Sequence, residues 1–341
     1  MNVLYILGNG FDMAQGMKTS YPEFYQYLME NTDSGSPLLQ QLKKDINADK
    51  LLWSDMEEAF GQFTSKVNTE KELEDLYFEL SDNLQKYLEK EENKFIPSQE
   101  LKNKFVEDFI HPEKYMGETD RNNYNSFVKK IKQDRFIKDI IMSKHSIHEH
   151  DLDIHVMTFN YTNTLEKLLS LNSSTDKNRH LKDNKYFRQV VHVHGRLKDS
   201  IIIGVDNEEQ IANEQFRVKQ DVTDFLIKRQ SYEAMKNNQH KICEDFIRYS
   251  NLIILYGVSL GSTDAYWWEL IGENLINRVD LCVIQYLYIP DVNLPTRKQL
   301  LARAERKQLQ CVLEKFNIRK EMNLNITDRL IFITNSNAFK I

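Results

Sequence analysis

The sequence lacks several features that would assign it to a familiar class of protein. It has three cysteines, Cys243, Cys282 and Cys311, whose wide spacing excludes a CxxC zinc module and shows no disulfide framework. No apolar run reaches the roughly 18 residues that a membrane helix requires. No basic leader of the kind found in signal peptides precedes the first apolar run. We therefore expect a cytoplasmic protein without a membrane partner.

A large excess of basic residues is also absent. The 341 residues include 45 basic and 51 acidic side chains, which gives a net charge of -6. This balance argues against an extended nucleic-acid-binding face. The hydrophobic content of 41% is typical of a globular protein, and the length suffices for one large domain or two ordinary ones.

Residues 3–12, VLYILGNGFD, combine a short apolar run with two closely spaced glycines. The run is short for a helix and predicts a buried strand. Gly8 and Gly10 allow a tight turn and a close approach of the backbone to a ligand. A capping box at 20–23 predicts a helix, and strand, glycine turn and helix together can offer backbone N–H groups to a phosphate. The pattern departs from the dinucleotide fingerprint GxGxxG, because Met13 takes the place of the third glycine.

The remaining chain divides into a helical part and a part in which strands and helices alternate. Residues 36–145 show helical patterns, the clearest from Leu73 to Leu88, and no convincing strand. Beyond them, predicted strands cover 154–159, 189–194, 201–204, 252–257, 281–287 and 330–333, and predicted helices cover 162–170, 220–248, 264–277 and 296–316. The alternation predicts an α/β fold with a doubly wound, mostly parallel, Rossmann-like sheet. Residues 1–35 and 146–341 would form this domain, with 36–145 as an all-helical insertion.

Several of the predicted strands end in small or polar residues. These ends are Gly8-Asn9-Gly10-Phe11-Asp12, Asn160-Tyr161-Thr162, His194-Gly195 and Gly257-Val258-Ser259-Leu260-Gly261. In open α/β sheets, ligands bind beyond the carboxyl ends of the strands. We therefore predict one convergent site at this edge. Asp264 is a further candidate, which can either pair with the site or cap the helix that follows it.

Single members of this set also have simpler explanations. Asn160 can cap the helix that is predicted to follow it. His192 and His194, two apart on a strand, share a face and can hold a metal, supply a general base or satisfy buried hydrogen bonds. A metal is the least favoured of these, because no matching carboxylate or cysteine motif accompanies the pair, and the stretch 145–150 is interpreted as solvated chain. Ser259 lacks the GxSxG context of a nucleophile elbow, which argues against a serine hydrolase.

Taken in order, these motifs resemble those of the AbiH-type bacteriophage abortive-infection proteins. The resemblance rests on residues 8–12, 18–21 with Phe24, 159–166, 192–195 and 257–264, and it extends over nearly the whole chain. It implies a role in antiviral defence.

The same motifs are more distantly similar to those of sirtuin-like domains in antiviral NAD-consuming proteins. That similarity places Gly8, Gly10 and Asp12 at the glycine and serine positions of a GAGxS turn that binds the dinucleotide, with Asn9 in place of alanine. The four-cysteine zinc module of deacetylase sirtuins has no counterpart in this chain.

The similarity also implies roles for the later motifs. Asn160 matches the asparagine of a TxNxD motif near the nicotinamide ribose, although Thr162 replaces the aspartate. His194 takes the place of the catalytic histidine that precedes a glycine. Gly257 and Ser259 fall in the GxS motif that contacts the adenosine half.

The resemblance therefore implies a sirtuin-like fold and NAD as the substrate, hydrolysed at the nicotinamide–ribose bond. His194 would act as a general base, and Asn160 would hold the ribose or a water. The expected binding residues are Gly8, Asn9, Gly10, Phe11, Asp12, Tyr161, Gly257, Ser259 and Asp264. Two alternatives stay open, a sensor that binds NAD or ADP-ribose without turnover and a metal-dependent transferase or nuclease. We expect no metal, and the sequence leaves open whether the chain forms a homo-oligomer.

Overall fold

A seven-stranded sheet forms the centre of the computed structural model, which describes residues 1–341 except 32–34, 142–151, 172–176, 290–297, 320–325 and 341. The strands are β1 (Asn2–Leu7), β2 (Leu152–Thr158), β3 (Arg179–Lys182), β4 (Lys185–His192), β5 (Leu252–Tyr256), β6 (Cys282–Leu287) and β7 (Leu330–Thr334). Their order in the sheet is β3-β4-β2-β1-β5-β6-β7, and every neighbouring pair except β3 and β4 is parallel. The described chain is thus mixed α/β with a mostly parallel sheet, as the sequence predicts.

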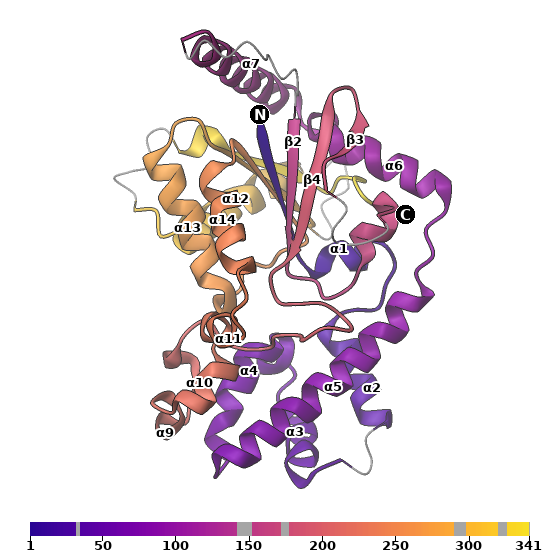
Figure 1. Cartoon of the computed structure of the whole chain (residues 1–341), viewed down its shortest axis with the longest axis vertical. Helices are drawn as coiled ribbons and strands as arrows, with labels where there is room; N and C mark the ends of the chain where they lie inside the picture. The colour runs from indigo at the N-terminus through magenta and orange to yellow at the C-terminus, as the bar shows by residue number, and fades with distance from the viewer. Residues whose placement is uncertain (32–34, 142–151, 172–176, 290–297, 320–325, 341) are drawn as a thin grey trace.

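Helices cover both faces of this sheet, because its strands are apolar on both sides. In β1, Val3, Tyr5 and Leu7 point to one face, while Leu4 and Ile6 point to the other, and each is at most 2% exposed. The first face is covered by α6 (Gln99–Ile110), α7 (Glu118–Ile141) and α8 (Thr164–Leu169), and the second by α12 (Gln239–Tyr249), α13 (Ala265–Asn277) and α14 (Lys298–Lys315) (Figure 1). Burial of each such side chain stabilises the fold by about 1.5–3 kcal/mol.

A second group of helices packs together at the edge of the sheet where β1 ends. It contains α2 (Tyr21–Asn31), α3 (Pro37–Ala48), α4 (Met56–Phe63) and α5 (Glu70–Lys94), and we call it the helical cluster. In Figure 1 these helices lie together below the sheet, beside α9 (Glu214–Arg217), α10 (Gln220–Leu226) and α11 (Lys228–Ala234). The predicted stripe of α5 packs in the core of this cluster. Within 36–145 the described residues form helices, of which α6 and α7 pack on the sheet and not in the cluster.

The predicted strand at 201–204 is not part of the sheet, and this prediction was wrong. One residue of this segment forms an isolated bridge. The backbone amide of Ile203 donates to the hydroxyl of Tyr77, and that of Gly204 donates to the carboxylate of Glu57. A strand needs these amides for its neighbour in the sheet. Side chains from the helical cluster therefore occupy the groups that would have paired with another strand.

The strand predicted at 189–194 has different bounds in the structure. It begins at Lys185, ends at His192 and pairs antiparallel with β3, which the sequence did not predict. The turn between β3 and β4 contains Asp183 and Asn184, whose φ angles are 50° and 57°. Two-residue hairpin turns favour Asn and Asp because they require positive φ. Asp183 and Asn184 are therefore a signal for this hairpin in the sequence.

The single helix predicted over 220–248 is divided into α10, α11 and α12. Ile227 has extended backbone angles, φ -97° and ψ 113°, and separates the first two helices. A passing segment stabilises the break, since Lys228 N–H donates to the carbonyl of Val205 at 3.0 Å and Val205 N–H donates to that of Leu226 at 2.9 Å. The break places Lys228 at the first position of α11, where it reaches the candidate site.

His155 on β2 is expected to make stability depend on pH. Its ring centroid lies 4.5 Å from that of Phe246, and its Nδ1 atom is buried without a hydrogen-bond partner. Burial lowers the pKa of His155 from 6.5 to about 4. The unfolded chain therefore binds a proton that the folded protein does not, and stability present above pH 6.5 is lost as the pH falls toward 4.

The measurement compares urea unfolding of the wild type and His155→Phe, which keeps an aromatic ring against Phe246. Between about pH 7.5 and pH 5, the wild type should lose about 2 kcal/mol of unfolding free energy more than the variant. The same pH dependence in both proteins would contradict a buried neutral imidazole.

Candidate functional site

A cavity of about 350 Å³ lies where the carboxyl ends of β1, β2, β4 and β5 meet. The chain runs from β1 outward to β2 and β4 and then returns to β5 on the other side of β1. Ligands of open α/β sheets bind at such a reversal, and the volume is within the range of about 300–1,000 Å³ for small-molecule sites. All predicted site residues except Phe11 line it, namely Gly8, Asn9, Gly10, Asp12, Asn160, Tyr161, His194, Gly257, Ser259 and Asp264.

Phe11 lies outside the cavity and belongs to the core. It is 1% exposed, and its ring contacts those of Phe105, Tyr256 and Phe339. The reason is that the chain enters a short helix, α1 (Asn9–Ala14), directly after β1, and this helix turns the phenyl ring away from the site. Phe11 therefore holds α1 against the sheet and does not reach a ligand in the cavity.

The glycines after β1 and β5 let two loops touch. A Cβ atom on Gly10 would lie 2.6 Å from the Cα of Gly257, and Gly257 itself has a φ of 68°. The N–H groups of Gly8 and Gly10 donate to the carbonyls of Tyr256 and Gly257 at 3.0 Å, and that of Phe11 donates to Gly8 at 2.8 Å. These three amides are already bonded within the protein. They are therefore not free to hold a phosphate, in contrast to the expectation for the glycine turn.

The two histidines have different surroundings, since β4 ends at His192 and only His194 lines the cavity. The buried ring of His192 places Nδ1 2.8 Å from the carbonyl oxygen of Asn160 and Nε2 2.8 Å from Oε1 of Glu166. Burial alone would raise the pKa of Glu166, but His192 and Arg196 bring it below its ordinary value. His192 therefore satisfies buried hydrogen bonds and fixes the backbone of Asn160.

Asp12 and Asn160 line the cavity with buried polar side chains. Asp12 is 2% exposed, and its Oδ2 accepts a hydrogen bond from the hydroxyl of Thr162 at 2.5 Å. Its Oδ1 and the side-chain amide nitrogen of Asn160 are buried and make no well-aligned hydrogen bond, although Asn160 lies close enough to lower the pKa of this carboxyl. Burial raises the pKa of Asp12 to about 6. Asn160 does not cap α8, whose N-cap residue is Asn163.

His194 faces the carboxylate of Asp264. Its Nε2 lies 3.1 Å from Oδ1, without the alignment of a good hydrogen bond. The side chain of Asp264 does not cap α13. Of the two roles expected for it, Asp264 therefore pairs with the site and does not cap the helix. Burial and nearby Lys228 lower the pKa of His194 below 6.5, which Asp264 only partly offsets. The imidazole is therefore neutral near pH 7 and can accept a proton.

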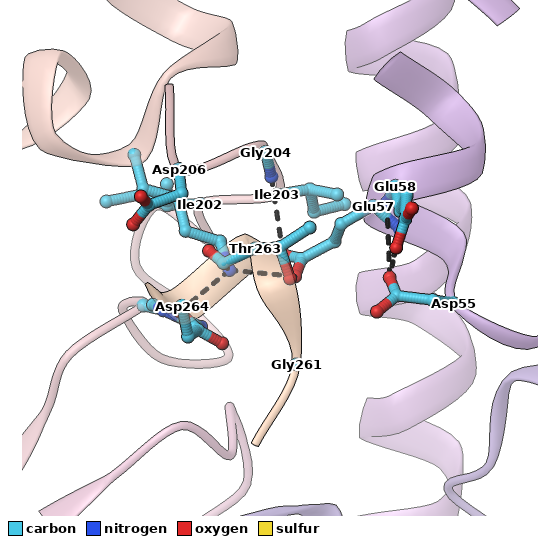
Figure 2. A network of polar contacts seen from close by, with 12 residues as sticks. Asp55, Glu57, Glu58, Ile202, Ile203, Gly204, Asp206, Gly261, Thr263 and Asp264 are labelled. Carbon is cyan, nitrogen blue, oxygen red and sulfur yellow. Dashed lines mark hydrogen bonds and ion pairs between the residues drawn. The ribbon is translucent and has the colours of Figure 1, made fainter. Parts of the chain in front are cut away.

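Asp264 belongs to a buried charge cluster with Glu57 and Lys228. Lys228 is 4% exposed, and its Nζ lies 2.8 Å from Oε2 of Glu57 and 3.0 Å from Oδ1 of Asp264. Figure 2 shows Glu57 reaching across to Thr263 and Gly204, whose hydroxyl and N–H donate to it at 3.1 and 3.3 Å. Burial alone would raise the pKa of Asp264, but Lys228 holds it well below its usual range, while burial raises that of Glu57.

Glu57 and Lys228 are not among the site residues that the sequence predicts. Glu57 had a signal, because it interrupts the apolar stripe of α4 next to Met56 and three residues before Phe60, where a carboxylate needs a buried partner. No signal in the sequence indicated Lys228, because the helix break that places it beside the site was not predicted. These two residues connect the helical cluster to the candidate site.

Within the described residues, no group of three or more His, Cys, Asp and Glu side chains could hold a metal ion. The stretch 145–150, interpreted above as solvated, lies outside those residues. No described helix has both the length and the apolar character required to cross a bilayer.

Comparison with known proteins identifies the family. The chain matches the model of the family described as "Bacteriophage abortive infection AbiH" over residues 4–286, which is more than half of its length and includes the whole lining of the cavity. No curated protein matches the sequence significantly. On the extent of the family match, the chain belongs to the AbiH family of bacteriophage abortive infection proteins.

Proposed function

We propose that this protein acts in phage defence by hydrolysing NAD at the nicotinamide–ribose bond, with His194 as the general base. Membership of the AbiH family supports the role in abortive infection. The observation that carries the chemistry is a buried, neutral imidazole held beside a carboxylate in a cavity of ligand size. The proposal includes a Rossmann-like, sirtuin-like domain of residues 1–35 and 146–341 that binds NAD, and a helical insertion of residues 36–145.

In this reaction, a water attacks C1′ of the ribose as the bond from C1′ to the nicotinamide nitrogen breaks. The electron pair of that bond remains on the nitrogen, which leaves as neutral nicotinamide. His194 takes the proton of the attacking water and later releases it to solvent, and ADP-ribose is the second product. The transition state resembles an oxocarbenium ion, whose positive charge the carboxylates of Asp12 and Asp264 would stabilise. The amide nitrogen of Asn160, which makes no well-aligned hydrogen bond within the protein, would donate to a ribose hydroxyl or to the water.

A sensor that binds a nucleotide without turnover is the second candidate, and one observation favours it. Ser54, Asp55 and Glu57 line the cavity although they come from the region of the helical cluster, so a ligand would contact both the sheet loops and the helices. Binding could therefore change how the two parts pack. No chemical step is needed for such a signal.

Incubation of the purified protein with NAD, followed by chromatography, distinguishes the two candidates. The hydrolase should release nicotinamide and ADP-ribose in equal amounts, at a rate proportional to protein concentration. Saturable binding of NAD without nicotinamide would instead establish the sensor. If the protein neither releases nicotinamide nor binds NAD, both candidates are wrong.

A further inference from the structure

We infer that the cavity recognises the positive charge of an N-ribosylpyridinium group, and that the phosphates of the ligand contribute little to its affinity. This inference rests on the proposed function and specifies which half of the substrate is bound most tightly. Oxidised NAD has a cationic nicotinamide ribose at one end and an anionic pyrophosphate in the middle. The lining of the cavity distinguishes between these two charges.

The charged side chains that line the cavity are all acidic, apart from the neutral His194. They are Asp12, Asp55, Glu57 and Asp264, and no lysine or arginine is among the described residues of the lining. Lys228 lies behind two of these carboxylates and is already bonded to both. In a partly enclosed site of reduced dielectric constant, this arrangement attracts a cation and repels a phosphate.

Aromatic rings also line the cavity, from Tyr21, Phe159, Tyr161 and Trp268. The ring centroids of Phe159 and Tyr161 lie 5.0 and 6.5 Å from that of His194, and that of Trp268 lies 5.6 Å from Phe159, so aromatic rings gather beside the proposed base. Aromatic faces attract organic cations and provide flat apolar surfaces. Carboxylates and rings together therefore suit a planar cation.

Two buried atoms point to the sugar attached to that cation. Asp12 Oδ1 is an acceptor and Asn160 Nδ2 is a donor. The two residues lie near each other and are 2% and 8% exposed, but neither atom makes a well-aligned hydrogen bond within the protein. A ribose hydroxyl can donate to the first and accept from the second, whereas an ionised phosphate cannot donate. The amides of Gly8, Gly10 and Phe11, which could have held a phosphate, are bonded within the protein.

Four ligands separate the contributions of ring charge, ribose and phosphate. Oxidised NAD has all three, NADH has a neutral ring, ADP-ribose has no ring, and nicotinamide riboside has no phosphate. We expect oxidised NAD and nicotinamide riboside to bind within about threefold of each other, and NADH and ADP-ribose about tenfold or more weakly. The measurement is equilibrium binding to His194→Gln, in which turnover is slowed, and the two ligands without the scissile bond to a cationic ring, NADH and ADP-ribose, are also measured on the wild type.

Charge variants test the same inference. Asp12→Asn and Asp55→Asn should each weaken the binding of oxidised NAD about three- to tenfold and leave the affinity for NADH unchanged. Asp55 is the N-cap of α4, and Asn caps helices as well as Asp does, so the second variant keeps the fold if the first does not. Glu30→Gln makes the same charge change at an exposed position of α2 and should alter the affinity for neither ligand.

NADH or ADP-ribose that binds as tightly as oxidised NAD would overturn the inference, and so would nicotinamide riboside that does not bind. These results are distinguishable from failure of the proposed hydrolysis. Preferential binding of oxidised NAD without nicotinamide release would leave the inference standing and exclude the hydrolase. If nicotinamide is released and NADH inhibits the release with an affinity equal to that of oxidised NAD, the hydrolase stands and the inference is overturned.

Discussion

Replacing Lys228 with methionine is expected to lower the free energy of unfolding by about 3–5 kcal/mol. The ammonium is buried between Glu57 and Asp264, and its removal leaves two carboxylates facing each other without a cation. Methionine fills a similar space, so the loss measures the missing charge more than a cavity. Urea denaturation of the variant beside the wild type gives the value.

Two further variants test the explanation. Lys241→Met on the exposed side of α12 removes the same charge outside the cluster and should change stability by less than about 0.5 kcal/mol. Adding Glu57→Gln to Lys228→Met removes one of the two opposed carboxylates and should restore about 1–2 kcal/mol. A loss below about 1 kcal/mol in Lys228→Met would show that the cluster is not closed in solution.

Replacing His194 with alanine is expected to slow nicotinamide release from NAD about 100- to 10,000-fold, which is the usual contribution of a general base. The fold should survive, because Lys228 still pairs with Asp264 in the variant. His194→Gln keeps more of the side-chain volume and should show the same loss. His180→Ala, which removes an exposed histidine of β3, is the matched control and should retain full activity.

The pH profile adds a readout that a purely structural histidine would not move. Neutral His194 is the active form, and burial together with Lys228 lowers its pKa below 6.5. Activity should therefore persist as the pH falls to 6.5 and decline only below it, where Asp12, with a pKa of about 6, also becomes protonated. A decline centred above pH 7, or an unchanged acid limb in active His194→Ala, would exclude this histidine as the base.

Much of the fold and the location of the cavity could be predicted from local patterns. Apolar runs such as residues 3–7 and 252–256 became strands, because strands buried on both faces need no polar alternation. Parallel strands bring their carboxyl ends to one edge, so Gly8, Asn160 and His194 line one cavity although they are far apart in the chain.

The hydrogen-bond and ion-pair partners of single residues could not be predicted, since they depend on how distant segments of the chain pack. Lys228 and Glu57 are 171 residues apart, and no period in the sequence connects them. The backbone amides of residues 203 and 204 donate to side chains of the helical cluster, so this segment does not form the predicted strand. Gly10 was predicted in a tight turn but lies in the first turn of α1, where it packs on Gly257 and its amide is bonded to the protein.

The most direct test of the account is the amount of nicotinamide released from NAD by the wild type, His194→Ala and Asn160→Ala at equal concentrations of folded protein. We predict nicotinamide and ADP-ribose in equal amounts from the wild type, and about 100-fold less or lower from both variants. Equal release by all three proteins would contradict the assignment of this cavity as the site of the reaction.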